Sequence, residues 1–335
     1  MITFDGVTKR YADGTVAVDN LSLEAASGTI TVFVGPSGCG KTTSLRMINR
    51  MIDATAGRIL LDGQDVKAIE PATLRRGIGY VIQQAGLFPH RRIVDNIATV
   101  PYLLGWDRKK ARARAMELLE RVGLDPKLAR RYPFQLSGGQ QQRVGVARAL
   151  AADPPVLLMD EPFSAVDPVV RASLQEELLR LQSELHKTIV FVTHDIDEAV
   201  KLGDTVAVFR VGGHLAQISD PATLLSEPAD DFVRGFLGRD RGIRRLSFIP
   251  AADVPLSPPP PELVLAEGKP VGWKLDGGLR PYGSFNPATD SLRAALDASL
   301  LSANGLAVAV DGDGGVLGVL GRDALDAAVS GVARG

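Results

Sequence analysis

The sequence predicts an α/β fold built on a buried, mainly parallel sheet. Three short apolar runs have the composition of strands covered on both faces, Ile30–Val34, Val156–Met159 and Ile189–Thr193. Between them, residues 41–52 and about 168–186 have helical character. Strands that alternate with helices are typical of a parallel α/β sheet.

Two regions depart from this alternation within the first 237 residues. Residues 2 to about 34 contain apolar patches broken by turn residues, which predicts short strands. Residues 85 to 155 are mainly helical, with helices expected at Arg108–Val122 and Gln140–Ala151. We therefore expect a helical subdomain inserted at about 85–155.

A change of character near residue 238 predicts a second domain over 238–335. The prolines at 258–261 form a stiff stretch. Residues 285–335 then have the pattern strand–helix–strand–helix, with strands expected at Ala307–Val310 and Val316–Leu320. The total of 335 residues agrees with about two domains.

The composition narrows the class of protein. Hydrophobic residues make up 45% and charged residues 23% of the chain, as in ordinary globular proteins. The net charge of −1 gives no reason to expect a nucleic-acid partner. Cys39 stands alone, so no disulfide within the chain is expected. We expect no secretory signal and no membrane span, because no apolar run approaches about 18–20 residues. A membrane role would need partner chains.

The segment Gly35–Thr42 fits the phosphate-binding pattern G-x-x-x-x-G-K-[ST]. It follows an expected strand and opens an expected helix, which is the context that this pattern requires. Glycines let backbone N–H groups surround phosphate oxygens, Lys41 places a cation on the β- and γ-phosphates, and Thr42 offers a hydroxyl to Mg²⁺. We assign the phosphate site to Ser37, Gly38, Cys39, Gly40, Lys41, Thr42 and Thr43.

Two adjacent acids end the apolar run that begins at Val156. Asp160 suits the Walker B role, which is to hold the shell of a Mg²⁺ ion. Glu161 is placed to orient or deprotonate an attacking water molecule. Taken without the phosphate-binding loop, this pair would equally suit a solvent-facing strand end.

The segment Leu136–Gln140 identifies the family. Ser137, Gly138, Gly139 and Gln140 form a turn at an expected helix start, which can offer a hydroxyl, N–H groups and a helix dipole to phosphate. This segment resembles the signature of ATP-binding cassette (ABC) proteins. The resemblance covers about residues 1–237. It implies a P-loop NTPase core of the RecA type, an antiparallel β subdomain and the inserted helical subdomain, with ATP and Mg²⁺ bound.

The resemblance also implies the residues that contact the base and the metal. Tyr11 resembles the aromatic residue that stacks on adenine, with Val18 beside it. Gln83 resembles the glutamine that senses Mg²⁺ and water, and Gln84 is the alternative for that role. The implied metal site consists of Thr42, Gln83 and Asp160.

The last two family motifs concern the dimer and the γ-phosphate. The segment Ser164–Asp167 resembles the D-loop at the dimer seam, which adds Asp167 to the nucleotide site. His194 resembles the switch histidine that contacts the γ-phosphate, so the implied catalytic set is Glu161, His194 and Gln83. In such proteins the signature of one copy serves the ATP held by the other. We therefore expect a dimer of two copies of this chain.

The kind of ABC protein is indicated by the stretch Gly79–His90, which resembles the same region of osmoprotectant importers for glycine betaine, carnitine, choline and proline. Such a chain would lie at the cytoplasmic face of the cell membrane. It would bind two permease subunits, with Leu87, Phe88 and Pro89 as contact candidates, and would act indirectly with an extracytoplasmic solute-binding protein. An importer for a sugar, polyamine, amino acid or metal is the alternative. An ABC ATPase outside transport and a P-loop kinase fit less well.

The tail supports the same group. Residues 290–329 resemble a cystathionine-β-synthase (CBS) module, which osmoprotectant importer ATPases often carry in pairs. Here the first half of the pair, about 243–285, is short and interrupted by prolines. Gly321 replaces the usual Thr or Ser of the second, and Asp323 is one residue off the usual spacing. We expect a small α/β regulatory or dimerisation domain without a nucleotide; a packing appendage is the other interpretation.

Overall fold

The computed structural model of the chain describes residues 1–83, 85–164, 166–252 and 254–332. It divides into two compact units. The first comprises Met1–Leu224 and Pro228–Phe236, and the second comprises Leu225–Glu227 and the residues from Leu237 onward. Each unit has its own hydrophobic core, as expected of an independently packed domain.

A central sheet with the strand order β10-β9-β3-β8-β7-β6 organises the first unit. All neighbouring strands are parallel except β9 and β10. Every residue of β3, β7 and β8 is buried, which confirms the three strands expected from the apolar runs. The bounds are β3 Ile30–Val34, β6 Ile78–Val81, β7 Val156–Asp160, β8 Thr188–Thr193, β9 Thr205–Arg210 and β10 His214–Ser219.

The register of this sheet sets the position of the site. Val34 of β3 pairs with Thr193 of β8, and Asp160 of β7 pairs with Val192 of β8. Parallel strands end at a common edge, where α/β proteins bind their ligands. The segments that follow β3, β7 and β8 therefore lie side by side.

A second, antiparallel sheet with the order β2-β1-β4-β5 belongs to the same unit. Its bounds are β1 Ile2–Arg10, β2 Val16–Ala25, β4 Ala56–Leu61 and β5 Gln64–Asp65. The two sheets share one core, in which the ring of Phe33 lies 6.2 Å from that of Phe4 and 5.1 Å from that of Phe209. The shared core thus connects β1, which ends just before Tyr11, and β2, which contains Val18, to the strand that enters the phosphate-binding loop.

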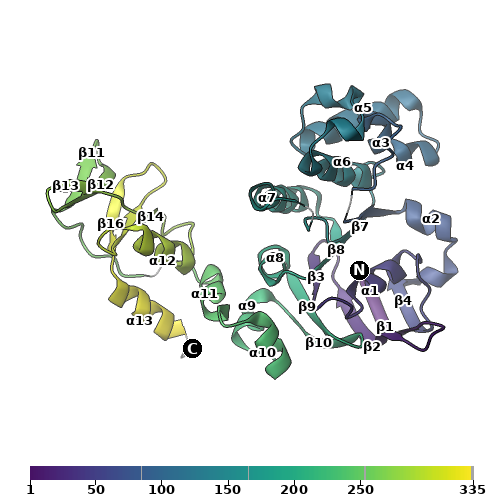
Figure 1. Cartoon of the computed structure of the whole chain (residues 1–335), viewed down its shortest axis with the longest axis horizontal. Helices are drawn as coiled ribbons and strands as arrows, with labels where there is room; N and C mark the ends of the chain where they lie inside the picture. Colours follow the sequence, from purple (N-terminus) through teal and green to yellow (C-terminus); the bar gives the residue numbers. More distant parts are fainter. Residues whose placement is uncertain (84, 165, 253, 333–335) are drawn as a thin grey trace. The chain divides into compact units, whose positions relative to one another are not determined.

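Several helices of the first unit follow one another between two strands of the central sheet. Figure 1 shows α3, α4, α5 and α6 gathered at one end of the unit, in the stretch of chain between β6 and β7. The bounds are α1 Lys41–Ile48, α2 Pro71–Arg76, α3 Ile93–Ile97, α4 Thr99–Leu103, α5 Arg108–Arg121, α6 Gly138–Leu150, α7 Pro168–Leu185, α8 Ile196–Leu202, α9 Pro221–Ser226 and α10 Asp231–Leu237. Short 3₁₀ helices occupy Val66–Ala68, Pro126–Arg130 and Pro133–Gln135.

The helix expected over residues 41–52 is shorter than predicted, because α1 ends at Ile48. Asn49 caps it, and its Oδ1 accepts a hydrogen bond from the backbone N–H of Met51 at 3.1 Å. Arg50 has a left-handed backbone with φ 54°, which stops the helix. The apolar spacing of Met51 and Ile52 continues past this turn and misled the prediction.

The second unit contains two small sheets. β14, β15 and β16 form one, with β14 parallel to β15 and β15 antiparallel to β16, and its core includes Phe285, Leu292 and Leu320. The other is an antiparallel meander of β11, β12 and β13, which the sequence pattern did not predict. The bounds are α11 Arg241–Arg245, β11 Leu263–Ala266, β12 Lys269–Leu275, β13 Gly278–Arg280, β14 Ser284–Phe285, α12 Leu292–Leu301, β15 Ala307–Val310, β16 Val316–Leu320 and α13 Arg322–Val332, with a 3₁₀ helix at Leu246–Phe248.

Candidate nucleotide-binding site

The phosphate-binding loop joins the carboxyl end of β3 to the start of α1. Gly40 has φ 96°, and a Cβ atom there would lie 2.2 Å from the carbonyl oxygen of Ala17, so a side chain is excluded by both backbone and space. Ser37 and Gly38 are exposed at the tip of the loop, and Thr43 is half-buried in the first turn of α1. The loop thus places backbone N–H groups at a helix N-terminus, where an anion binds.

Lys41 brings a cation to this loop. Its side chain is buried, and Nζ donates hydrogen bonds to the carbonyl oxygens of Gly35 at 2.8 Å and Pro36 at 2.9 Å. Cys39 is fully buried, and burial raises the pKa of its thiol despite the nearby ammonium of Lys41. The Cys39 side chain therefore belongs to the core, and its backbone N–H donates to the carbonyl oxygen of Pro36 at 3.4 Å.

The hydroxyl of Thr42 meets the carboxylate of Asp160. Thr42 Oγ1 donates to Asp160 Oδ1 at 2.8 Å, across from the start of α1 to the end of β7. The other carboxylate oxygen, Oδ2, lies 3.3 Å from Arg46 Nη2 and 3.3 Å from the hydroxyl of Tyr80. Oxygen ligands from a hydroxyl and a carboxylate are the set that Mg²⁺ prefers, so these residues fit the expected ion.

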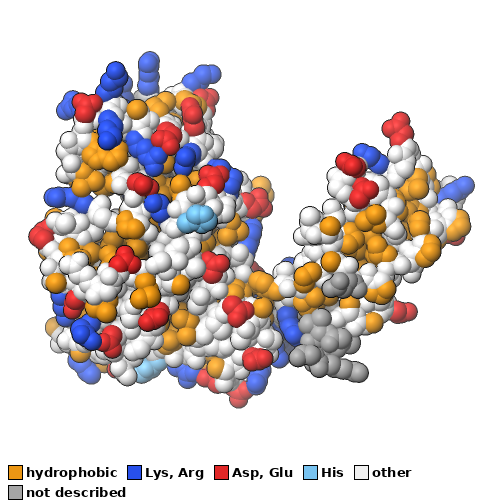
Figure 2. All heavy atoms as spheres, turned by 180° about the vertical axis from the view of Figure 1, so that it is seen from behind, with side chains coloured by type: hydrophobic (Ala, Val, Ile, Leu, Met, Phe, Trp, Pro, Cys, Tyr) orange, Lys and Arg blue, Asp and Glu red, His pale blue; other side chains and the backbone are white. Residues whose placement is uncertain are grey.

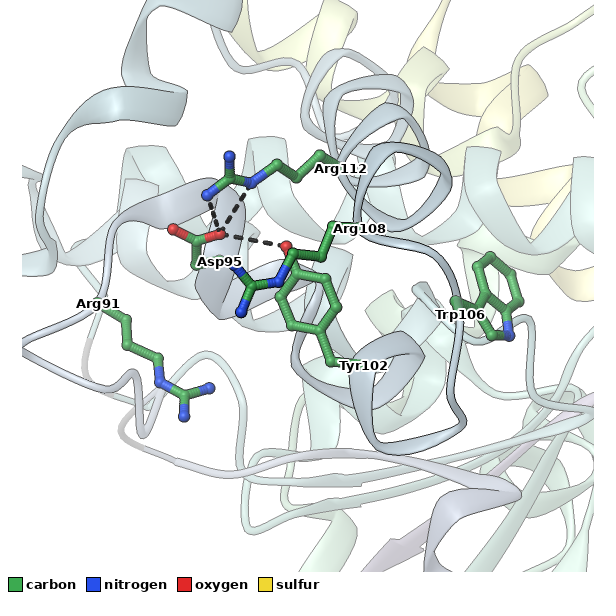
Figure 3. Close-up of a pocket in the computed structure, with 6 residues that line it drawn as sticks. All are labelled: Arg91, Asp95, Tyr102, Trp106, Arg108 and Arg112. Carbon is green, nitrogen blue, oxygen red and sulfur yellow. Dashed lines mark hydrogen bonds and ion pairs between the residues drawn. The ribbon is translucent and has the colours of Figure 1, made fainter.

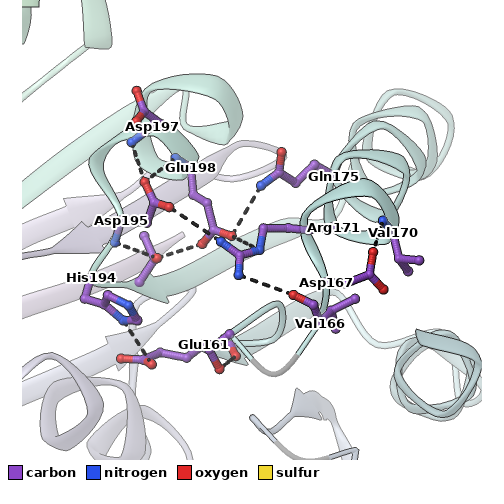
Figure 4. Close-up of polar contacts among 12 residues, drawn as sticks. Glu161, Val166, Asp167, Val170, Arg171, Gln175, His194, Asp195, Asp197 and Glu198 are labelled. Atoms are coloured by element: carbon purple, nitrogen blue, oxygen red, sulfur yellow. Dashed lines mark hydrogen bonds and ion pairs between the residues drawn. The ribbon is translucent and has the colours of Figure 1, made fainter. Parts of the chain in front are cut away.

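Glu161 and His194 meet beside this pair. Glu161 follows β7 and His194 follows β8, and Glu161 Oε2 lies 3.2 Å from His194 Nδ1 (Figure 4). The backbone N–H of Glu161 donates to the carbonyl oxygen of Val192 at 3.0 Å. Glu161 has φ 46°, a left-handed conformation that costs a non-glycine residue about 1–3 kcal/mol and that is common at functional sites.

The roles of all the expected site residues stay predictions. Within the part of the chain that the structure describes, Tyr11, Val18 and Gln83 make no contact with the residues above that would place them at the nucleotide. Tyr11 is exposed at the end of β1, with Lys9 Nζ 5.1 Å from its ring centroid. Val18 is fully buried in the core behind Gly40. Gln83 lies two residues beyond β6 with an exposed side chain. The competing Gln84 lies outside the described residues.

The signature segment caps α6. Ser137 Oγ accepts a hydrogen bond from the backbone N–H of Gln140 at 3.3 Å, and Gln140 Oε1 accepts one from the N–H of Ser137 at 3.0 Å. A Cβ on Gly138 would meet nothing within 4 Å, whereas one on Gly139 would lie 2.6 Å from Val170. Among the described residues, no hydrogen bond joins this turn to the phosphate-binding loop. The chain brings the loop, Asp160, Glu161 and His194 together, but not the signature.

Asp167, the expected D-loop residue, caps α7, and its Oδ1 accepts a hydrogen bond from the N–H of Val170 at 3.0 Å. The same segment reaches the catalytic edge through Ser164, whose hydroxyl donates to the carbonyl oxygen of Glu161 at 2.9 Å. Ala165 lies outside the described residues. The D-loop segment is therefore tied to Glu161 at one end and to α7 at the other.

The comparisons with known proteins agree with this geometry. The sequence profile of the ABC transporter family matches residues 18–164. The osmoprotectant import ATP-binding protein OsmV of Salmonella typhimurium is 52% identical over 259 residues, which cover 76% of this chain and 68% of OsmV. The chain belongs to the ABC transporter family.

Other relatives within the ABC transporter family carry related names. The choline transport ATP-binding protein OpuBA of Bacillus subtilis is 53% identical over 247 residues, and the glycine betaine uptake system ATP-binding protein YehX of Escherichia coli is 50% identical over 254 residues. These matches cover 74% and 76% of this chain, and 65% of OpuBA and 82% of YehX. The chain thus spans slightly less than two thirds of OpuBA.

Solved structures of the ABC transporter family share the fold. The dimeric, post-hydrolysis cassette MJ0796 bound to ADP and Pi is 33% identical, with a TM-score of 0.60 over 66% of this chain and 99% of that one. The structure of cbiO1 from Clostridium perfringens is 28% identical, with a TM-score of 0.63 over 74% and 98% of the two chains. Each alignment covers nearly the whole length of the solved chain. The matched part of this protein therefore contains the complete ABC cassette fold.

Two residues that contact the predicted site of this ABC protein, Arg46 and Tyr80, are not among the site residues that its sequence motifs predict. Both contact Asp160 Oδ2, and burial is the main cause that raises the pKa of the Tyr80 hydroxyl. Arg46 follows Thr42 by four residues on α1, so helical spacing could have placed it on the same face. Tyr80 gave no such signal, because it reaches Asp160 only through the pairing of β6 with β7.

A separate basic pocket of about 510 Å³ lies among the helices of this ABC cassette (Figure 3). Within it, Asp95 Oδ1 accepts hydrogen bonds from Arg112 Nε at 3.1 Å, Arg112 Nη2 at 2.9 Å and the hydroxyl of Tyr102 at 3.2 Å. Arg91 and Arg108 also line it, and Figure 2 shows Lys and Arg side chains gathered at this end of the first unit. The lining contains none of the residues assigned to the nucleotide.

Among the described residues, no helix combines the length and the apolar character that crossing a membrane requires.

Proposed function

We propose that the chain is the ATP-hydrolysing subunit of an ABC importer for quaternary-amine osmoprotectants such as glycine betaine. The observation that carries the chemistry is the meeting of Glu161 with His194, 3.2 Å apart, beside the contact of Thr42 with Asp160. The cargo is supported by the relatives OsmV, OpuBA and YehX, whose names give osmoprotectant, choline and glycine betaine.

In the proposed reaction, water attacks the γ-phosphorus of ATP in line with the departing ADP. Glu161 orients the water and takes its proton, while His194 holds the γ-phosphate and fixes the carboxylate of Glu161. Lys41 and the backbone N–H groups of residues 37–43 bind the β- and γ-phosphates, and Tyr11 stacks on adenine with Val18 beside it. Mg²⁺, held by Thr42, Asp160 and Gln83, would neutralise charge on the phosphates.

The site is proposed to close only between two copies of the chain. Ser137, Gly138, Gly139 and Gln140 of the second copy would cover the γ-phosphate, with Asp167 at the seam. Support comes from the open space at Gly138 and from the dimeric state in which the related cassette MJ0796 was solved. A helix N-terminus opposite the phosphate-binding loop would add a second set of N–H donors for the same phosphate.

Permease subunits are proposed to contact the surface around Phe88. Its side chain is 39% exposed, and its backbone is clamped by Asn96, whose Oδ1 accepts from the Phe88 N–H at 2.7 Å and whose Nδ2 donates to the Phe88 carbonyl oxygen at 3.1 Å. Phe88 lines a cavity of about 230 Å³ with Val100 and Arg148. Leu87 and Pro89 are the neighbours of Phe88 in the sequence. Two such permease subunits would hold the chain at the cytoplasmic face of the membrane, and a solute-binding protein would act from the other side.

The second unit is proposed to be a degenerate CBS-type regulatory or dimerisation domain. Support comes from the order β14–α12–β15–β16–α13 within residues 284–332. The meander of β11–β13 occupies residues 263–280, within the stretch 243–285 where the first module of a pair would lie, which supports an incomplete pair.

Uptake by a reconstituted complex tests the proposal. The full chain, reconstituted with its permease and binding protein, should accumulate radiolabelled glycine betaine in an ATP-dependent manner, and Glu161→Gln should abolish accumulation. Excess unlabelled choline or carnitine should compete, and maltose should not. ATP hydrolysis without glycine betaine uptake would contradict the proposed cargo and would still support the ATPase activity.

A further inference from the structure

Helix α7 carries an arginine that reaches two loops of the site. Asp167 caps the helix, and Arg171 follows one turn later. Arg171 Nη2 donates a hydrogen bond to the carbonyl oxygen of Val166 at 3.3 Å. Figure 4 shows its guanidinium lying between the segment Val166–Asp167 and the start of α8. One planar group therefore contacts the proposed dimer seam from within the chain.

The same guanidinium faces two acids that follow His194 by one and by four positions. Arg171 Nη1 lies 3.7 Å from Asp195 Oδ2, and Arg171 Nε lies 4.0 Å from Glu198 Oε1. Asp195 is the N-cap of α8, where its Oδ1 accepts from the N–H of Asp197 at 2.8 Å. The contact with Val166 is a hydrogen bond, whereas the two carboxylates lie beyond hydrogen-bond distance and attract the guanidinium as ions, and among the described residues its buried Nε has no hydrogen-bond partner. A planar guanidinium can face a carbonyl and two carboxylates together, which a single ammonium group cannot.

Both neighbours of His194 are held by this cluster. The hydroxyl of Thr193 donates to Glu198 Oε2 at 2.7 Å and accepts from the backbone N–H of Asp195 at 3.0 Å. The Glu198 side chain is only 7% exposed, and burial is the main cause that raises the pKa of its carboxyl group. A buried carboxylate needs a cation within reach, so removal of Arg171 should disturb the backbone on both sides of His194.

We propose that Arg171 is a positioning residue that ties the D-loop segment Val166–Asp167 to the loop of His194. Contact of a second copy with this segment is then transmitted through Arg171, which sets His194 against Glu161 for cleavage. The inference deepens the proposed function and rests on it for the role of the second copy. The tie itself, from the Val166 carbonyl to Asp195 and Glu198, lies within one chain.

The test compares Arg171→Gln with Arg180→Gln in the full chain. Arg180 lies on the same helix, is exposed, and pairs with Glu177 and Glu184, each at 2.6 Å, so its variant removes a cation without touching either loop. The chain has four histidines, and the NMR signals of their imidazole groups can be followed one by one in the absence of nucleotide. In Arg171→Gln the His194 signals should shift or broaden while those of His90 and His214 stay; in Arg180→Gln His194 should be unchanged.

Single-turnover ATP cleavage gives the second readout. Arg171→Gln should slow cleavage by about ten- to a hundred-fold, as a misplaced catalytic group does, while the Kd for ATP stays within about threefold. Arg171→Lys keeps the charge beside Glu198 but not the planar guanidinium, so it should lie between wild type and Arg171→Gln in both readouts. It also serves as the test if Arg171→Gln does not fold.

Two outcomes would overturn the inference. If a folded Arg171 variant keeps wild-type His194 signals, Arg171 does not position His194. If the His194 signals shift but ATP cleavage is normal, the positioning does not matter for catalysis. A wild-type chain that hydrolyses no ATP would instead count against the proposed function, because the NMR comparison needs no nucleotide.

Discussion

Glu161 Oε2 lies 3.2 Å from His194 Nδ1, at the edge where β7 and β8 end. The two residues are 33 positions apart in sequence, and the parallel pairing of Asp160 with Val192 brings them together. Glu161 itself has a left-handed backbone, with φ 46°. The pair therefore depends on the register of the sheet.

Glu161→Gln should lower ATP turnover by about 10²- to 10⁴-fold, since it removes the proposed general base but keeps the size and polarity of the side chain. ATP-bound dimers of this variant should persist and be visible by size-exclusion chromatography with light scattering. Glu176→Gln, an exposed carboxylate on α7, is the control and should hydrolyse normally. Undiminished hydrolysis by Glu161→Gln would remove the assigned role.

Thr42→Val should raise the Mg²⁺ concentration needed for half-maximal hydrolysis by about tenfold or more, because the hydroxyl that faces Asp160 is lost at nearly constant volume. Titration of Mg²⁺ at fixed ATP measures this. Thr29→Val removes a surface hydroxyl that donates to the Ala26 carbonyl oxygen, and it should leave the titration unchanged. Identical Mg²⁺ curves for Thr42→Val and wild type would rule out Thr42 as a metal ligand.

Cys39 should resist alkylation at neutral pH. Burial raises the pKa of its thiol, and the thiolate is the reactive form, so both access and protonation oppose the reaction. The raised pKa favours the folded state below the ordinary thiol pKa, and this contribution is lost as pH rises through the folded value. Mass spectrometry after iodoacetamide treatment should show slow labelling in buffer and rapid labelling in guanidinium chloride. Fast labelling of the folded chain at pH 7 would contradict the buried position.

The second unit should bind no adenine nucleotide. Isothermal titration of the full chain with a non-hydrolysable ATP analogue should then give about one site per chain. The reason is that Gly321 offers no side-chain hydroxyl where CBS modules often place one, and a Cβ there would meet only Leu306 at 3.5 Å. Gly321→Thr is the matched variant and should not change the stoichiometry for the first unit. A stoichiometry near two would show a further nucleotide site.

The sequence predicted those parts of the site that depend on neighbours along the chain. The pattern of the phosphate-binding loop, the buried strands and the turn at Ser137 all follow from local spacing, although α6 begins at Gly138 and not at the expected Gln140. The environment of Asp160 did not, because Arg46 and Tyr80 reach it from different elements.

Two predictions about elements failed for local reasons. The helix after the phosphate-binding loop was expected to reach residue 52, but the left-handed backbone of Arg50 ends it early. The meander β11–β13 was missed because Gly268 and Gly277, at its two turns, lie among short strands with exposed residues and weak alternation. Val18 is fully buried behind Gly40, and its place beside the base stays a prediction.

The division of the active site between two copies is tested most directly by mixing two inactive chains. Lys41→Ala disables the phosphate-binding loop. Gly138→Asp places a charge at the start of α6, where the fold has room and the helix dipole favours it, but where it would repel the γ-phosphate of the partner's ATP. Each variant alone should be inactive. Mixed in equal amounts, they should form heterodimers with one intact site and recover single-turnover ATP cleavage well above either variant. Cleavage in the mixture no higher than the mean of the two variants would contradict a site shared between two chains.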